Sequence, residues 1–125
     1  MTALEQDLLA EIDRRRDEFV CFFQDFVRIA TPNPPGETRE AARLLGTFLD
    51  RHGLAYRTIG PRPEWPNLVA DVTLGGPGRH LVLNGHIDVF PAGEDARWRH
   101  GSPWSGGIGD GRLYGRGTAA MKCGT

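Results

Sequence analysis

His86 and Asp88 are the residues whose types and spacing best suit chemistry. They stand two positions apart, just after the apolar run Leu81-Val82-Leu83. Such a short apolar run is typical of a strand covered on both faces. Residues i and i+2 of an extended chain project to the same side. We therefore predict that both side chains face one pocket at the carboxyl end of a central strand, where open α/β sheets hold their sites.

A histidine with a neighbouring carboxylate suits metal binding. Neutral imidazole is a good zinc ligand. A carboxylate beside it can accept the other ring N–H and so fix the tautomer and the orientation of the ring. Taken alone, a His-x-Asp pair is weak evidence of a metal site, and a purely structural role for His86 and Asp88 is favoured.

The elements that must position this pair begin with helices. Apolar residues recur at helical spacing over residues 3–29, as one helix or as two broken near Arg15. The prolines of residues 31–36 must end it, because proline removes a donor and restricts the residue before it. A second helix is predicted over about residues 37–52, with Gly53 as its stop.

Strands are predicted in the middle of the chain. Residues 54–60 and 67–74 carry strand patterns, and residues 75–78, Gly-Gly-Pro-Gly, form a turn before the run 81–83. Helices followed by strands at this spacing predict a layered α/β domain.

Composition and charge narrow the functional classes. The chain has 125 residues, the size of one domain, and a formal net charge of −1. This balance favours neither nucleic acid nor an anionic membrane as a partner. The sequence contains no apolar stretch long enough to span a bilayer and no signal-peptide pattern, so we expect a cytoplasmic protein. Cys21 and Cys123 form no zinc-type spacing and are expected to be reduced thiols.

Several motifs together carry a family resemblance. The order is residues 84–91, Asn-Gly-His-Ile-Asp-Val-Phe-Pro, then residues 103–106, Pro-Trp-Ser-Gly, then residues 110–122, which end in Gly-Arg-Gly-Thr-Ala-Ala-Met-Lys. This series resembles the N-terminal part of the M20 family of metallopeptidases and amidohydrolases, which includes acetylornithine deacetylase and succinyl-diaminopimelate desuccinylase. Residues 31–37 also resemble a loop of these deacylases, so the resemblance covers nearly the whole chain.

The resemblance implies a zinc site with two ions in the complete enzyme. His86 matches a ligand of one zinc, and Asp88 matches an active-site acid that supports this histidine. Ala120 occupies the place of the aspartate that bridges the two metals, and it is not expected to bind. Lys122 is expected either near the metal centre or as a surface charge, and Cys123 is a remote candidate for a thiolate ligand.

The resemblance also implies a fold and an activity. Residues 1–125 are expected to form an incomplete catalytic domain, the N-terminal part of a three-layer zinc-peptidase-like α/β domain with a mixed sheet. The dimerisation domain, the C-terminal half of the catalytic domain and the remaining ligands are expected outside it. The family activity is hydrolysis of amide bonds in N-acyl amino acids or small peptides. We expect this chain to be inactive alone and to self-associate through exposed sheet edges. The alternative is a non-catalytic, degenerate module that binds a partner or a subunit.

Overall fold

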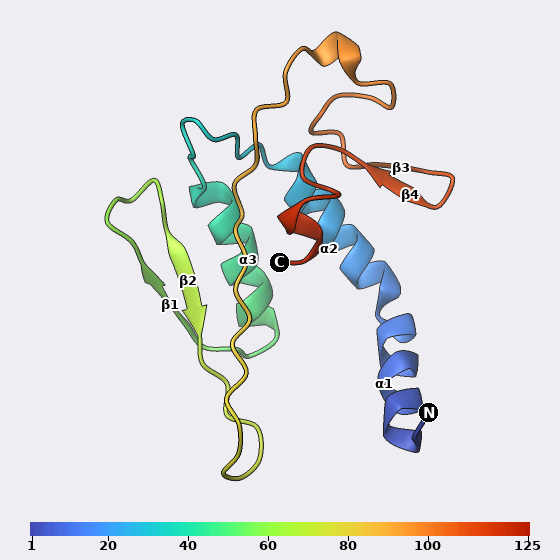
Figure 1. Cartoon of the computed structure of the whole chain (residues 1–125), viewed down its shortest axis with the longest axis vertical. Helices are drawn as coiled ribbons and strands as arrows, with labels where there is room; N and C mark the ends of the chain where they lie inside the picture. Colours follow the sequence, from blue (N-terminus) through green and yellow to red (C-terminus); the bar gives the residue numbers. More distant parts are fainter.

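The computed structural model describes all of residues 1–125. Three helices come first, and two small antiparallel sheets and two short 3-10 helices follow (Figure 1). Their bounds are α1 Ala3–Arg14, α2 Arg16–Arg28, α3 Arg39–Arg51, β1 Tyr56–Ile59, β2 Asn67–Ala70, η1 Asp95–Arg97, β3 Gly107–Gly109, β4 Arg112–Tyr114 and η2 Met121–Cys123.

The N-terminal helical region is two helices, in agreement with the predicted break near Arg15. Thr2 caps α1: its Oγ1 accepts a hydrogen bond from the Glu5 backbone N–H at 3.3 Å, and the Glu5 carboxylate accepts one from the Thr2 N–H at 2.7 Å. Between α1 and α2 the backbone of Arg15 leaves helical geometry. Its guanidinium donates to Glu18 at 2.8 Å, and Glu18 in turn contacts His52 at the end of α3.

The ends of α2 and α3 follow the sequence signals. The proline-rich segment 31–36 begins shortly after α2 ends at Arg28. The helix α3 ends at Arg51, and Gly53 has φ +66°, the left-handed conformation in which glycine commonly terminates a helix. Both terminations were predicted correctly to within about two residues.

Two hairpins make the sheets. Strands β1 and β2 pair antiparallel, with Tyr56 opposite Ala70, and they are shorter than the predicted strands 54–60 and 67–74. The hairpin of β3 and β4 was not predicted. Asp110 and Gly111 form its turn with φ +50° and +71°, and an Asp-Gly pair with positive φ at both positions is a strong hairpin signal.

The predicted central strand at residues 81–83 is wrong. Leu81, Val82 and Leu83 are 77%, 75% and 86% exposed, and none of them makes a backbone–backbone hydrogen bond. Neither of the two-stranded sheets includes residues 81–83, so no strand is paired with this segment. The mixed sheet expected around residues 81–83 is therefore absent, and Figure 1 draws this stretch as a trace without arrows.

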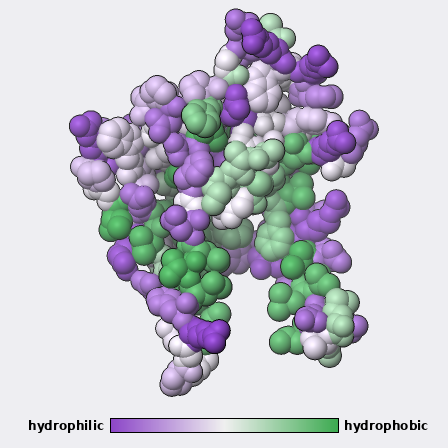
Figure 2. Space-filling model, in the orientation of Figure 1, coloured by the Kyte–Doolittle hydropathy of each residue, from purple (hydrophilic) through white to green (hydrophobic).

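The buried core is small and lies where α2, α3 and the segment at residue 89 meet. Only 13 of the 125 residues are buried, with Phe26, Val27, Ala41, Ala42 and Val89 as the apolar ones. The helix α1 buries no residue and projects from the rest of the molecule, and Figure 2 shows apolar side chains exposed on the limb that it forms. No helix is both long and apolar enough to cross a membrane. Much apolar surface thus remains open on this chain.

Candidate functional site

The structure brings the side chains of His86 and Asp88 together. The Nδ1 atom of His86 lies 3.1 Å from Oδ1 and 2.9 Å from the backbone oxygen of Asp88. Both neighbours are acceptors when the carboxyl is ionised, so Nδ1 carries the proton in this arrangement. The ring's Nε2 makes no hydrogen bond, and the side chain is 61% exposed. Its lone pair is therefore open to an incoming electrophile or metal ion.

The second carboxylate oxygen of Asp88 is also occupied. The side-chain amide of Asn33 donates a hydrogen bond to Oδ2 at 2.8 Å. This hydrogen bond is the largest cause that lowers the pKa of Asp88 below its ordinary value, with smaller contributions from its own backbone and from His86. Asp88 is therefore an ionised acceptor at neutral pH, as a partner of a histidine N–H must be.

A parallel backbone bridge holds these residues in place. The Asn33 N–H donates to the Val89 carbonyl at 2.8 Å, and the Val89 N–H donates to the Thr31 carbonyl at 2.9 Å. The hydroxyl of Thr31, which is fully buried, donates to the Ile87 carbonyl at 2.7 Å. The loop that follows α2 thus fixes residues 87–89 on both sides of Asp88.

The segment around η2 lies beside His86. The Thr125 hydroxyl lies between two carbonyl acceptors, 3.3 Å from that of His86 and 2.9 Å from that of Met121. A Cβ placed at Gly85 would meet the side chains of Met121 at 3.3 Å and Thr125 at 2.7 Å, so these two side chains pack against the backbone of Gly85. The two motifs that carry the family resemblance are therefore neighbours in space, although they are far apart in the sequence.

One of the two roles expected for Lys122, the surface charge, is wrong, whereas its place near a metal centre stays a prediction. It is 2% exposed, so it is no surface charge, and its Nζ donates to the carbonyls of Phe26 at 2.9 Å and Ile29 at 2.7 Å. These carbonyls lie at the C-terminal end of α2, where a cation is favoured. Burial lowers the pKa of Lys122 to about 8. Lys122 therefore fastens η2 to α2, and no pattern in the sequence had pointed to this role.

The donor set of these residues falls short of a complete metal centre. The side chain of Ala120 has no donor atom, and the Cys123 thiol is directed at the Ala120 carbonyl, 2.9 Å away. No group of three or more His, Cys, Asp or Glu side chains is placed to hold an ion. Zinc takes three or four protein ligands. These residues therefore offer one candidate ligand, His86, whose other ring nitrogen is hydrogen-bonded to Asp88.

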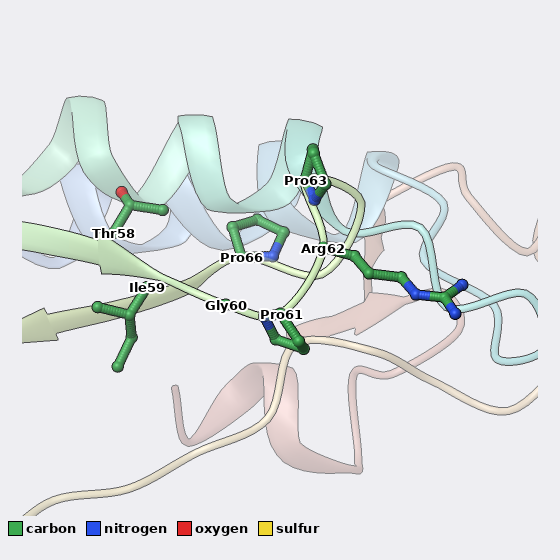
Figure 3. Close-up of a pocket in the computed structure, with 7 residues that line it drawn as sticks. All are labelled: Thr58, Ile59, Gly60, Pro61, Arg62, Pro63 and Pro66. Atoms are coloured by element: carbon green, nitrogen blue, oxygen red, sulfur yellow. The ribbon is translucent and has the colours of Figure 1, made fainter.

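A separate hollow of about 270 Å³ lies at the connection between β1 and β2 (Figure 3). Prolines 61, 63 and 66 are three of its seven lining residues. The Arg62 side chain extends away from them, with its guanidinium 4.8 Å from the centre of the Trp65 ring. It contains neither His86 nor Asp88. Because it has no cluster of titratable groups, this hollow has no part in the candidate site.

The residues missed by sequence reasoning are those that hold the pair. Asn33 and Thr31 belong to a segment noted for ending a helix and for its family resemblance. The proline-rich stretch was a signal of an ordered loop, yet nothing local indicates that it would contact Asp88, 55 positions later.

Comparison with known proteins identifies a family model and relatives that this chain matches. The model of peptidase family M20/M25/M40 matches residues 82–125, the part that holds both motifs. The chain is 34% identical over 122 residues to an N-formyl-4-amino-5-aminomethyl-2-methylpyrimidine deformylase of Halalkalibacterium halodurans, an alignment that covers 95% of this chain and 28% of that protein.

A second enzyme gives the same indication. A succinyl-diaminopimelate desuccinylase of Methylobacterium radiotolerans is 42% identical over 105 residues, which are 81% of this chain and 25% of that enzyme. The chain thus spans about a quarter of the length of the curated relatives it matches. The ordered motifs, their contact in space and these relatives lead to one conclusion: the chain belongs to the M20 peptidase family and corresponds to the N-terminal part of its members.

Proposed function

We propose that this chain supplies part of the active site of a two-zinc amide hydrolase, in which His86 is a zinc ligand and Asp88 is the active-site acid that supports His86. The observation that carries this proposal is the free Nε2 of His86, whose other ring nitrogen is held by Asp88 at 3.1 Å. A zinc-binding histidine commonly has such a carboxylate partner. Its relatives are a desuccinylase and a deformylase by name, so we propose N-acyl amino acids or similar small amides as the substrate class.

We further propose that residues 1–125 are part of a three-layer catalytic domain. In a complete domain, the exposed run Leu81-Val82-Leu83 would gain strand partners on both sides. One ligand cannot hold zinc as a closed site does. We therefore expect the chain alone to lose zinc on dialysis and to leave N-acetylornithine and N-acetylmethionine unhydrolysed.

Zinc titration of the isotopically labelled chain tests the role of His86. Zinc should shift the His86 Nε2 resonance, and His86→Ala should abolish the corresponding zinc binding. His80→Ala is the matched control, because His80 is also exposed and makes no hydrogen bond. Equal zinc binding by His86→Ala and the wild type would contradict the proposed ligand. Retention of one zinc per chain after dialysis would contradict the incomplete site.

A second candidate is a non-catalytic module that binds a partner or a subunit, and the alanine at position 120 favours it. Ala120→Asp should strengthen zinc binding only modestly, because His86 and one carboxylate are still too few ligands. Amide hydrolysis regained by Ala120→Asp in the isolated chain would exclude the module and would also show that two ligands suffice.

A further inference from the structure

Asn33 is the feature of this site with no assigned role. It belongs to the loop after α2, and its amide nitrogen donates to Asp88 Oδ2 at 2.8 Å across a separation of 55 positions. No arginine or lysine contacts the Asp88 carboxylate, and its one ion-pair partner is His86. Asn33 is thus the only side chain other than His86 that is hydrogen-bonded to this carboxylate.

Two hydrogen bonds fix the plane of the Asp88 carboxylate. His86 holds Oδ1 and Asn33 holds Oδ2. The terminal torsion of an aspartate is broad, so one bond alone leaves the carboxylate free to turn. The Asp88 side chain is 34% exposed, and water would compete for a free oxygen. With both oxygens held, Oδ1 stays directed at the imidazole.

The backbone of Asn33 is hydrogen-bonded to the segment that contains Asp88. Its N–H donates to the Val89 carbonyl at 2.8 Å, next to Asp88 in the chain. The neighbouring Thr31 carbonyl accepts from the Val89 N–H, which completes the bridge. The amide donor and its carboxylate acceptor therefore lie on the two segments that this isolated bridge joins, which fixes their relative position.

We propose that Asn33 is a positioning residue: it orients the Asp88 carboxylate so that His86 keeps its proton on Nδ1 and presents Nε2 to a zinc ion. This inference rests on the proposed function, which makes His86 the ligand. The side chain of Asn33 is hydrogen-bonded to Asp88 and not to His86, so it acts on the histidine through Asp88. Partners one shell outside a metal ligand typically change metal affinity by about 10–100-fold.

The test uses the full chain, zinc alone as the probe, and NMR of the histidine ring nitrogens. Asn33→Leu removes the donor and keeps the size of the side chain. We expect zinc affinity at His86 to fall by about tenfold or more, and the Nδ1 resonance to shift even without zinc. Asn67→Leu is the matched control, since it also removes an amide donor, here to the Ile59 carbonyl at 3.3 Å in the β1–β2 hairpin. It should change neither quantity.

A second variant distinguishes the loss of this hydrogen bond from a general loss of structure. Asn33→Asp keeps the shape of the side chain and replaces the donor with an acceptor, so it should repel Asp88 and shift Nδ1 as well. The Thr31 and Val89 amide signals report whether the bridge is intact. An intact bridge with wild-type zinc affinity and an unchanged Nδ1 resonance in both variants would overturn the inference. Failure of the proposed function gives a different result: zinc then binds His86→Ala and the wild type alike, whatever residue stands at position 33.

Discussion

Replacing Lys122 with methionine tests whether this buried amine fastens η2 to the end of α2. Lys122 is the only lysine of the chain, and its Nζ donates to the carbonyls of Phe26 and Ile29. Methionine has a similar length and no donor. The substitution therefore leaves both carbonyls without their partner while it fills nearly the same volume.

The structure sets the magnitude of this effect. A buried carbonyl that loses its donor costs about 1–3 kcal/mol. Of the two bonds, the one to Phe26 is fully buried and the one to Ile29 is partly reachable by water, so the second loss is partly compensated. Removal of a buried charge returns some free energy as well. We expect Lys122→Met to lower the free energy of unfolding by about 2 kcal/mol near pH 7.

The pH dependence of the free energy of unfolding is an independent test of the buried Lys122 amine. The folded-state pKa of Lys122 is about 8, below the ordinary 10.5. Between these values the unfolded chain binds more protons than the folded chain, so the free energy of unfolding rises with pH across this window. The pKa difference corresponds to an increase in the free energy of unfolding of at most about 3 kcal/mol. The measured increase should be smaller, because water reaches the contact with Ile29 and screens the charge. Lys122→Met should lack this component.

Urea unfolding followed by circular dichroism, from pH 7 to pH 10.5, measures both effects. Arg79→Met is the control, because Arg79 is exposed and makes no hydrogen bond. Acetylation with mass spectrometry adds a second readout, since in the folded chain the reagent should modify the N-terminal amine and spare Lys122. A change in unfolding free energy below about 0.5 kcal/mol, the range of ordinary surface substitutions, would refute the role of Lys122. So would acetylation of Lys122 as fast as that of the N-terminus.

Three further outcomes follow from the same contacts. Gly117→Ala should destabilise the chain by about 2–4 kcal/mol, because the backbone there has φ +94° and an added Cβ would lie 2.9 Å from Val89. The control Gly111→Ala has φ +71° but open space around it and should cost about 1 kcal/mol. Equal losses of unfolding free energy in urea would contradict this difference. Thr31→Val should cost about 1–2 kcal/mol by removing the buried hydroxyl's hydrogen bond, and an unchanged melting curve would count against it. The chain should self-associate through its exposed apolar surface, and Leu8→Glu on α1 should shift sedimentation towards the monomer; a wild type that sediments as a monomer at all concentrations would disprove this.

Local signals allowed most of the helical part to be predicted from the sequence. The break near Arg15, the end of α2 and the glycine after α3 all depend on residues close to the element that they shape. The turn of β3 and β4 was equally local, since Asp110-Gly111 is a strong hairpin signal, and it was overlooked. Local propensity thus accounts for these elements.

The prediction of a central strand at residues 81–83 was wrong for a different reason. Residues 81–83 have the composition of a buried strand, but composition does not supply a neighbour, and a strand exists only when another strand accepts its hydrogen bonds. The site was predicted in part for the same reason. The contact of His86 with Asp88 follows from their spacing of two, whereas the roles of Asn33 and Lys122 depend on partners 55 and 96 positions away.

The long separations also determine when the site can form. The helices and both hairpins are formed by residues close together in the sequence. The hydrogen bonds from Asn33 to Asp88 and from Lys122 to the end of α2 join residues 55 and 96 positions apart. Contacts between distant residues form slowly, because a long loop has to close first. During synthesis from the N-terminus, the carbonyls of Phe26 and Ile29 remain without their amine until almost the whole of this sequence has left the ribosome. We therefore expect the site to assemble late in folding, so substitutions at Asn33 or Lys122 should speed unfolding more than they slow folding.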